Sequence, residues 1–208
     1  MILTGPEIAK QYKAKKIVIT PFKKGRINPN SYDLSLGGEV GVYPDWVECF
    51  PNSKAKVEDG SKFIPIPDAI LDTKKKPNYQ KFTIDSEVGW VLRPGIGYLM
   101  HTAEVVTSSA FVSVLDGKSS IGRLFASVHE TAGYIDIGFN GQVTLEVTVK
   151  HALRVYPGMR FCQIRFHVPE GEILNYGKAP QTQSHYKGEN AKGPVPSMVW
   201  KQFEDSLS

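Results

Sequence analysis

Short runs of alternating apolar and polar residues, separated by turn-forming residues, constrain the fold of this chain more than any other feature. In the clearest run, GQVTLEVTV at 141–149, apolar residues alternate with polar ones such as Thr144 and Glu146. This period of two buries one face of a β-strand and leaves the other face polar. Comparable runs lie at 16–20, 89–95, 97–107, 111–117 and 161–168. Because Gly, Pro, Asn and Asp punctuate these runs, the pattern predicts an all-β sandwich or barrel.

The two ends of the chain differ from this strand-rich middle. Near the N-terminus, TGPE at 4–7 has the form of a capping box with an early proline, and apolar residues follow at helical spacing, which predicts a short helix. We expect a single β domain over 1–170, with a Pro-, Lys- and Asp-rich insertion or irregular arm at 50–88. Residues 171–208 are rich in Gly, Pro, Lys and Gln, which indicates a C-terminal tail or lid.

Composition argues against several classes of protein. The chain is 41% hydrophobic and 22% charged, as ordinary globular proteins are. No apolar run approaches the ~18 residues of a membrane-spanning helix, and the N-terminus lacks the apolar core of a signal peptide. We therefore expect a cytoplasmic protein without a membrane partner. Cys49 and Cys162 form no CxxC pair, which argues against a disulfide framework and a structural zinc site. The basic clusters lack interleaved aromatic residues, so we expect no nucleic-acid partner.

The chain also lacks the motifs of several enzyme classes. Neither H-x-E with a following P-C-x-x-C nor H-E-x-x-H is present, which argues against zinc hydrolysis. There is no G-x-S-x-G elbow, no Walker motif and no dinucleotide fingerprint. What remains is a carboxylate site. Glu146 lies on the polar face of its predicted strand, and Asp136 lies at the tip of a hairpin-like segment, 133–141.

A polar turn precedes these carboxylates. SSIGRL at 119–124 can form one helical turn, in which two hydroxyls and free backbone N–H groups would bind an anion. The same residues can also form a capped turn without a ligand. The turn by itself does not separate the two interpretations.

Taken together, these segments resemble the dCTP deaminase family, whose members are related to trimeric dUTPases. The resemblance is carried by NPNSYDLSLGG at 28–38, LRPGIGYLMHTAEVVT at 92–107, GKSSIGRL at 117–124, HETAGYIDIGFNGQVTLE at 129–146 and PGMRFCQIRF at 157–166. The opening MILTGPEIAK is similar to the N-terminal helix of the family. The resemblance implies a distorted β-barrel or jelly-roll of the dUTPase-like type, assembled as a homotrimer with active sites between subunits.

The resemblance also implies a metal-independent active site. Glu146 would act as general base and acid at C4 of a cytosine. Ser119 and Arg123 would orient the attacking water and keep Glu146 ionised, with Arg123 also close to phosphate. The backbone around Ala132 would hold that water, and His129 would brace the same loop.

The resemblance further implies how the nucleotide binds. Asp136 would bond the deoxyribose 3′-hydroxyl, and Thr144 and Leu145 would read the base edge largely through their backbones. The remaining expected substrate-binding residues are Lys118, Ser119, Ser120, Ile121, Gly122 and Arg123 of the polar turn, together with Gln163 and Tyr176. In the tail, His185 and Glu189 stand where the family has a Lys and a Gln that contact the outer phosphates, which predicts weaker binding of the γ-phosphate.

The implied activity is hydrolytic deamination of dCTP to dUTP and ammonia, for the supply of dUMP and dTTP. The alternatives are a bifunctional enzyme that forms dUMP and pyrophosphate, a deaminase that prefers dCMP because of the altered tail, a plain dUTPase, and an inactive nucleotide-binding regulatory protein. Mg²⁺ is expected as the counter-ion of the nucleotide phosphates, and zinc is not. A feedback role for dTTP is left open.

Overall fold

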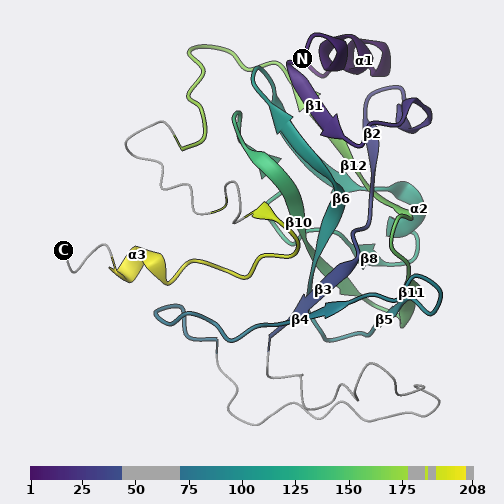
Figure 1. The fold of residues 1–208 in the computed structure, drawn as a ribbon, viewed down its shortest axis with the longest axis vertical. Coiled ribbons are helices and arrows are strands. Elements are labelled where there is room, and N and C mark those ends of the chain that lie inside the picture. The colour runs from purple at the N-terminus through teal and green to yellow at the C-terminus, as the bar shows by residue number, and fades with distance from the viewer. Residues whose placement is uncertain (44–70, 178–185, 187–190, 205–208) are drawn as a thin grey trace.

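The computed structural model describes residues 1–43, 71–177, 186 and 191–204, and antiparallel β-strands dominate this part of the chain (Figure 1). The strands of the largest sheet are β1 (Ile17–Thr20), β3 (Glu39–Val42), β4 (Gln80–Thr83), β6 (Tyr98–Ser108), β8 (Ala126–Ser127) and β10 (Asn140–Val149). In this six-stranded sheet the order is β4-β3-β6-β10-β8, and β1 also pairs with β6.

A second sheet and a small ribbon complete the β structure. The strands of the second sheet are β2 (Tyr32–Ser35), β7 (Val112–Gly117), β9 (Tyr134–Ile135) and β12 (Arg160–His167), in the order β2-β12-β7-β9. The ribbon consists of β5 (Trp90–Leu92) and β11 (Leu153–Val155). The helices are α1 (Gly5–Lys13), η1 (Lys24–Arg26), α2 (Ser119–Gly122) and α3 (Lys201–Glu204). The predicted all-β class is confirmed. Within the described residues no sheet closes on itself, so these strands do not form a closed barrel.

One hydrophobic cluster joins the two larger sheets. Val143 and Leu145 of β10 are buried in it together with Phe161 of β12. Burial of each such side chain contributes about 1.5–3 kcal/mol. Thr144 and Glu146 lie on the opposite face of β10 and stay partly exposed, which confirms the alternation predicted at 141–149.

The runs that predicted strands correspond to β1, β5, β6, β7, β10 and β12. The remaining strands, β2, β3, β4, β8 and β9, were not predicted. β2 is buried at every position, including the charged Asp33, and β8 and β9 have two residues each. The segment expected to be an irregular arm, 50–88, contains β4, which pairs with β3 at the edge of the large sheet. Residues 50–70 of that segment lie outside the described part of the chain.

Helix α1 confirms the predicted N-terminal helix, but the capping box does not form. Thr4 occupies the N-cap position without a side-chain capping hydrogen bond. Glu7 instead accepts a hydrogen bond from Gln11 Nε2 at 2.6 Å, which directs its carboxylate along the helix rather than back to Thr4. The helix lies at one end of the molecule, beside β1 (Figure 1).

The segment 133–141 is not a hairpin, contrary to the prediction. β9 pairs with β7 in the second sheet, whereas β10 pairs with β6 in the large sheet. The turn between β9 and β10 is closed by the N–H of Phe139, which donates to the carbonyl of Asp136 at 3.1 Å, and Gly138 in this turn has a φ of +91°. Such a φ favours glycine. The turn therefore passes from one sheet to the other and carries Asp136 to the edge between them.

After β12 the chain returns to the large sheet. The segment 191–198 runs beside β10, and α3 then leads away from the strands (Figure 1). Every helix in the described ranges is too short or too polar to cross a bilayer.

Candidate active site

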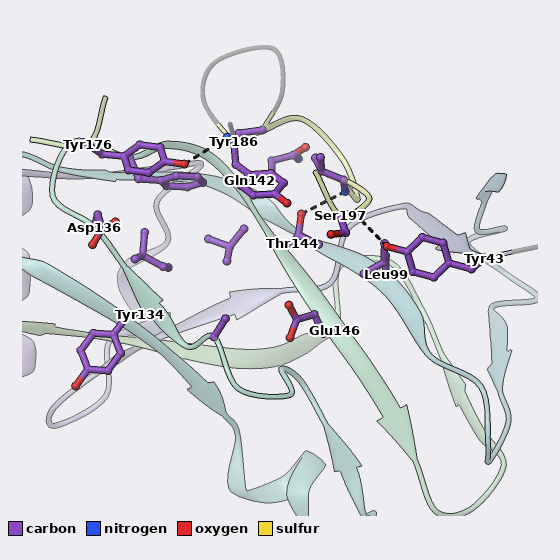
Figure 2. Close-up of a pocket in the computed structure, with 16 residues that line it drawn as sticks. Tyr43, Leu99, Tyr134, Asp136, Gln142, Thr144, Glu146, Tyr176, Tyr186 and Ser197 are labelled. Atoms are coloured by element: carbon purple, nitrogen blue, oxygen red, sulfur yellow. Dashed lines mark hydrogen bonds between the residues drawn. The ribbon is translucent and has the colours of Figure 1, made fainter. Parts of the chain in front are cut away.

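A cavity of about 440 Å³ lies between the polar face of β10 and the C-terminal tail (Figure 2). This volume is within the range of small-molecule sites. The expected site residues that line the cavity are Ala132, Asp136, Thr144, Glu146 and Tyr176. Three of the segments that were expected to share a site therefore meet here: the loop before β9, strand β10 and the start of the tail.

Strand β10 forms one wall of the cavity. Gln142, Thr144 and Glu146 all face it, because side chains two positions apart lie on the same face of a strand. The pairing of β10 with β6 shifts between Gln142 and Thr144. At this irregularity the Thr102 hydroxyl accepts a hydrogen bond from the N–H of Val143 at 2.9 Å, so the local break in the ladder leaves no orphaned donor at this residue.

Glu146 is partly buried in the cavity wall. Its Oε2 accepts a hydrogen bond from the backbone N–H of Glu130 at 3.0 Å. Leu99 of β6 lies directly opposite Glu146 and also lines the cavity. A carboxylate next to an aliphatic wall, with one fixed backbone donor, can take a proton from a bound water and return it.

The open edge of β10 is suited to backbone recognition. Because the Leu145 side chain is fully buried in the core, only its backbone can meet a ligand. β8 pairs with β10 at Thr148 and Val149, so no described strand covers the edge of β10 at Thr144 and Leu145. These are the two residues whose backbones were predicted to read a base.

Asp136 and Tyr176 lie toward the other end of the cavity from Glu146 (Figure 2). The N–H of Tyr176 donates to the carbonyl of Ile137 at 2.7 Å, which ties the start of the tail to the turn that carries Asp136. The Tyr176 hydroxyl accepts a hydrogen bond from the N–H of Tyr186 at 3.3 Å. Burial raises the pKa of Tyr176 above its ordinary value, so its phenol stays protonated at neutral pH.

The tail closes the cavity through its backbone. The N–H of Gly193 donates to Gln142 Oε1 at 2.7 Å, and the N–H of Val195 donates to the Thr144 hydroxyl at 3.3 Å. Two polar side chains of β10 thus hold the tail, and Glu146 lies next to them along the strand. Val195 and Ala191 of the tail line the cavity.

Two tyrosines outside β10 also hold the tail. The Tyr43 hydroxyl accepts a hydrogen bond from the N–H of Ser197 at 3.0 Å (Figure 2). The Tyr79 hydroxyl donates to the carbonyl of Pro194 at 2.6 Å. Burial raises the pKa of both tyrosines, so both hydroxyls remain neutral near pH 7.

The polar turn at 119–124 does not reach this cavity. The predicted helical turn is confirmed as α2, but none of its residues is among those that line the cavity. Ser119, Ser120, Gly122 and Arg123 are exposed, while Ile121 is buried and anchors the turn to the core. Within a single chain, the turn expected to bind phosphate therefore lies outside the cavity that holds the residues expected to bind the base.

Lys118 and Gln163 lie next to this turn, and both side chains are held by polar contacts. Lys118 Nζ forms an ion pair with the fully buried carboxylate of Asp33 at 2.8 Å. Gln163 Oε1 accepts a hydrogen bond from the Ser31 hydroxyl at 2.8 Å, and its Nε2 donates to the carbonyl of Gly117 at 2.9 Å. Both side chains thus connect the start of α2 to the second sheet.

His129 lies in the loop before β9, where it was expected to brace the backbone near Ala132. Its ring packs beside Gly133, where an added Cβ would lie 3.1 Å from His129 Nε2. His129 Nδ1 is buried without a hydrogen-bond partner among the described residues.

The structure adds cavity residues that the sequence interpretation missed, among them Tyr43, Gln142 and Tyr186. Gln142 had a detectable signal, because it shares the period of two with Thr144 and Glu146. Tyr43 and Tyr186 are remote in sequence from β10, and no pattern in the sequence signals their place in the cavity.

His185 and Glu189, expected to contact the outer phosphates, lie outside the described residues. No group of three or more His, Cys, Asp or Glu side chains that could hold a metal occurs in the described ranges, and the prediction of a zinc-free enzyme stays a prediction.

This open arrangement of β-sheets, with a carboxylate on the polar face of a central strand, has a counterpart among solved structures. The solved structure of 2′-deoxycytidine 5′-triphosphate deaminase from Agrobacterium tumefaciens has a TM-score of 0.56 to this chain at 21% identity, over 81% of this chain and 48% of that one. A family model described as dCTP deaminase-like matches residues 2–168. The chain belongs to the dCTP deaminase-like family.

Two curated relatives extend this assignment over the whole chain. Proteins named "dCTP deaminase, dUMP-forming" from Clostridium beijerinckii and Cytophaga hutchinsonii are 39% and 40% identical over 204 residues. The aligned residues cover 98% of this chain and 99% of each relative.

Proposed function

We propose that this chain is a bifunctional enzyme that converts dCTP and two waters to dUMP, ammonia and pyrophosphate. The observation that carries the proposal is the placement of Glu146, Asp136 and the Thr144 backbone edge around one cavity. The dUMP-forming relatives favour this reaction over simple release of dUTP, which was the first interpretation of the sequence.

The deamination step uses Glu146. Its carboxylate takes a proton from a water that attacks C4 of the cytosine, and the proton returns toward N3 and the leaving amine. The C–N bond breaks, ammonia departs and a uracil ring remains. A positioned carboxylate contributes typically ~10²–10⁴-fold. Orientation of the water and its exclusion from bulk solvent beneath the tail supply the rest.

The second step releases pyrophosphate. A second water attacks the α-phosphorus of the bound dUTP, the bond to the bridging oxygen breaks, and dUMP remains. Asp136 bonds the 3′-hydroxyl and holds the sugar, which keeps the α-phosphate in the same place for this step. Tyr176, which is tied to the Asp136 turn, contacts phosphate in this arrangement.

We further propose that the enzyme is a homotrimer with shared active sites. This assembly is supported by the absence of α2 from the cavity lining, because Ser119 and Arg123 are exposed and would be free to enter the cavity of a neighbouring copy. Lys118, Ser120 and Gln163 would then stand beside the phosphates of that same nucleotide. A subunit-mixing experiment tests the assembly. R123A and E146Q, each unable to deaminate dCTP alone, should regain ammonia release when unfolded and refolded together, and no recovery would contradict shared sites.

Mg²⁺ would enter with the nucleotide, held by phosphate oxygens and water, as this ion commonly is. It neutralises phosphate charge when bound. Ammonia release should survive a zinc-selective chelator. The expected dTTP feedback ligand and the cytoplasmic location remain part of this proposal.

The test of the proposed function measures two products separately. The purified chain is incubated with dCTP, dCMP or dUTP in the presence of Mg²⁺, and ammonia and pyrophosphate are quantified. Equal amounts of both products from dCTP are expected. Ammonia without pyrophosphate would identify a strict deaminase, and pyrophosphate from dUTP without ammonia from dCTP would identify a plain dUTPase. Binding without either product would identify a regulatory protein.

Because the tail differs from that of the family, the number of phosphates that the preferred substrate carries is tested separately. A comparison of kcat/KM for dCTP, dCDP and dCMP decides it. We expect the preference for dCTP to be retained but reduced, because a carboxylate at Glu189 replaces a neutral amide near the outer phosphates. Higher kcat/KM for dCMP would instead support the dCMP-preferring alternative.

A further inference from the structure

The loop between β8 and β9, residues 128–133, contains an exposed residue that bonds to β10 in two ways. The backbone N–H of Glu130 donates to Glu146 Oε2 at 3.0 Å. The side chain of Glu130 accepts, at Oε1, a hydrogen bond from the Thr148 hydroxyl at 2.9 Å. Glu130 therefore contacts the proposed general base through its backbone and the strand that carries this base through its side chain.

The two bonds are coupled by the geometry of the strand. Glu146 and Thr148 are two positions apart on β10, so their side chains lie on the same face. The ends of the loop are fixed separately. Ser127 pairs with Thr148 in the β8–β10 ladder, and the carbonyl of Gly133 accepts a hydrogen bond from the N–H of Leu115 at 2.7 Å. The bond between Glu130 and Thr148 joins the middle of the loop to the strand.

Glu146 needs a fixed orientation to act on a water. A glutamate on a strand can occupy several side-chain rotamers, and only some of them direct an oxygen into the cavity. A backbone donor on Oε2 selects one orientation and leaves Oε1 for the water. The donor can do so only while the loop stays at a constant distance from β10.

We propose that Glu130 is a positioning residue for Glu146. Its side chain binds Thr148, which holds the loop against β10 and directs the N–H of Glu130 at the Glu146 carboxylate. The proposal rests on the proposed function, in which Glu146 serves the deamination step. Because pyrophosphate release does not use the Glu146 carboxylate, loss of this arrangement should slow deamination selectively.

Paired substitutions test the proposal in the full-length chain. E130V and T148V remove the acceptor and the donor, whereas E130Q and T148S keep an oxygen acceptor and a hydroxyl. We expect E130V and T148V to lower kcat for ammonia release from dCTP about fivefold to tenfold, with KM changed less than about twofold. E130Q and T148S should restore kcat to within about twofold of the unaltered enzyme. Pyrophosphate release from dUTP should be unchanged in all four variants.

Two further measurements separate positioning from a loss of folding. The double variant E130V/T148V should be no slower than either single variant, because both substitutions remove the same bond. E170V, at an exposed glutamate after β12, is the matched control and should equal the unaltered enzyme. Melting temperatures are recorded for every variant.

The outcomes distinguish this proposal from the function on which it rests. Unchanged deamination in E130V and T148V, alongside its loss in E146Q, would overturn the positioning role alone. An equal loss of both reactions in E130V and T148V, with lowered melting temperatures, would also overturn it, because the bond would then serve stability only. Undiminished ammonia release in E146Q would overturn the proposed function itself.

Discussion

Ala191 of the C-terminal tail packs directly against Gly141 of β10, and the contact leaves no room for a side chain at position 141. Glycine is required here by the close approach of two backbones rather than by its own φ. Gln142 and Thr144, the next polar positions along β10, bond the backbone of the tail. The tail is therefore positioned by the strand that carries Glu146.

The first prediction concerns this contact. G141A should displace the tail from the cavity and lower kcat/KM for dCTP about tenfold, which corresponds to about 1.4 kcal/mol. Limited proteolysis should show faster cleavage of the tail. G97A is the matched control, because a Cβ at Gly97 would meet no atom within 4 Å. Unchanged cleavage and unchanged kcat/KM in G141A would mean that the seating of the tail has no part in catalysis.

The second prediction concerns the carboxylate. E146Q keeps the size of the side chain and removes its ability to take a proton, so ammonia release from dCTP should fall at least ~10²-fold. Cleavage of dUTP to dUMP should persist in the same sample, since the proposed step at the α-phosphorus assigns no role to this group. E172Q, at an exposed glutamate, serves as control. Ammonia release at the normal rate in E146Q would remove the basis of the proposed chemistry.

The third prediction concerns the buried ion pair behind α2. Asp33 is fully buried and Lys118 is 26% exposed, so K118M leaves a buried carboxylate with weakened compensation. Asn28 still donates to Asp33 at 2.7 Å, and Arg160 still forms an ion pair with it at 3.5 Å. We therefore expect a loss of about 2–3 kcal/mol in the free energy of unfolding, below the range for a fully orphaned charge.

Urea denaturation measures this loss against an exposed pair. Lys75 and Asp72 form an ion pair in which the side chains are 80% and 41% exposed, and K75M should cost no more than about 0.5 kcal/mol. Equal losses in K118M and K75M would show that the pair with Asp33 has no special role in stability.

The fourth prediction concerns pH. Burial lowers the pKa of His101 below its ordinary value, so the unfolded chain binds a proton at this residue more readily than the folded protein does. Stability is fully present above the unfolded pKa of about 6.5 and is lost as pH falls toward the folded pKa. The pKa of His167 is also lowered, chiefly by burial, and contributes with the same sign.

Thermal melting between about pH 7.5 and about pH 5 checks the pH prediction. The Tm of the unaltered protein should fall with pH, and H101N should reduce this dependence. H151N, at an exposed histidine, should leave the dependence as it is. An identical slope in H101N and the unaltered protein would exclude His101 as a source of the effect.

Local patterns in the sequence determined the polar face of β10. Because side chains alternate along any strand, the run at 141–149 was sufficient to place Thr144 and Glu146 on one face and Leu145 in the core. The helical turn at α2 and the short helix α1 followed from equally local signals. The family resemblance predicted which residues would share a site, and Ala132 and Asp136 line one cavity with Glu146; their roles stay predictions.

Only the tertiary structure decided which remote segments surround that face. The 133–141 segment has the alternation of a hairpin, yet β9 pairs with β7 because the chain crosses between sheets at Asp136. Ala191 lines the cavity because it packs against Gly141 of β10, and Tyr43 lines it beside Ser197 of the C-terminal tail. No sequence pattern near Tyr43 or Ala191 indicates a place in the cavity. The physical reason is that side-chain periodicity is a property of the local backbone, whereas strand pairing and tail placement depend on free energies shared between segments far apart in the chain.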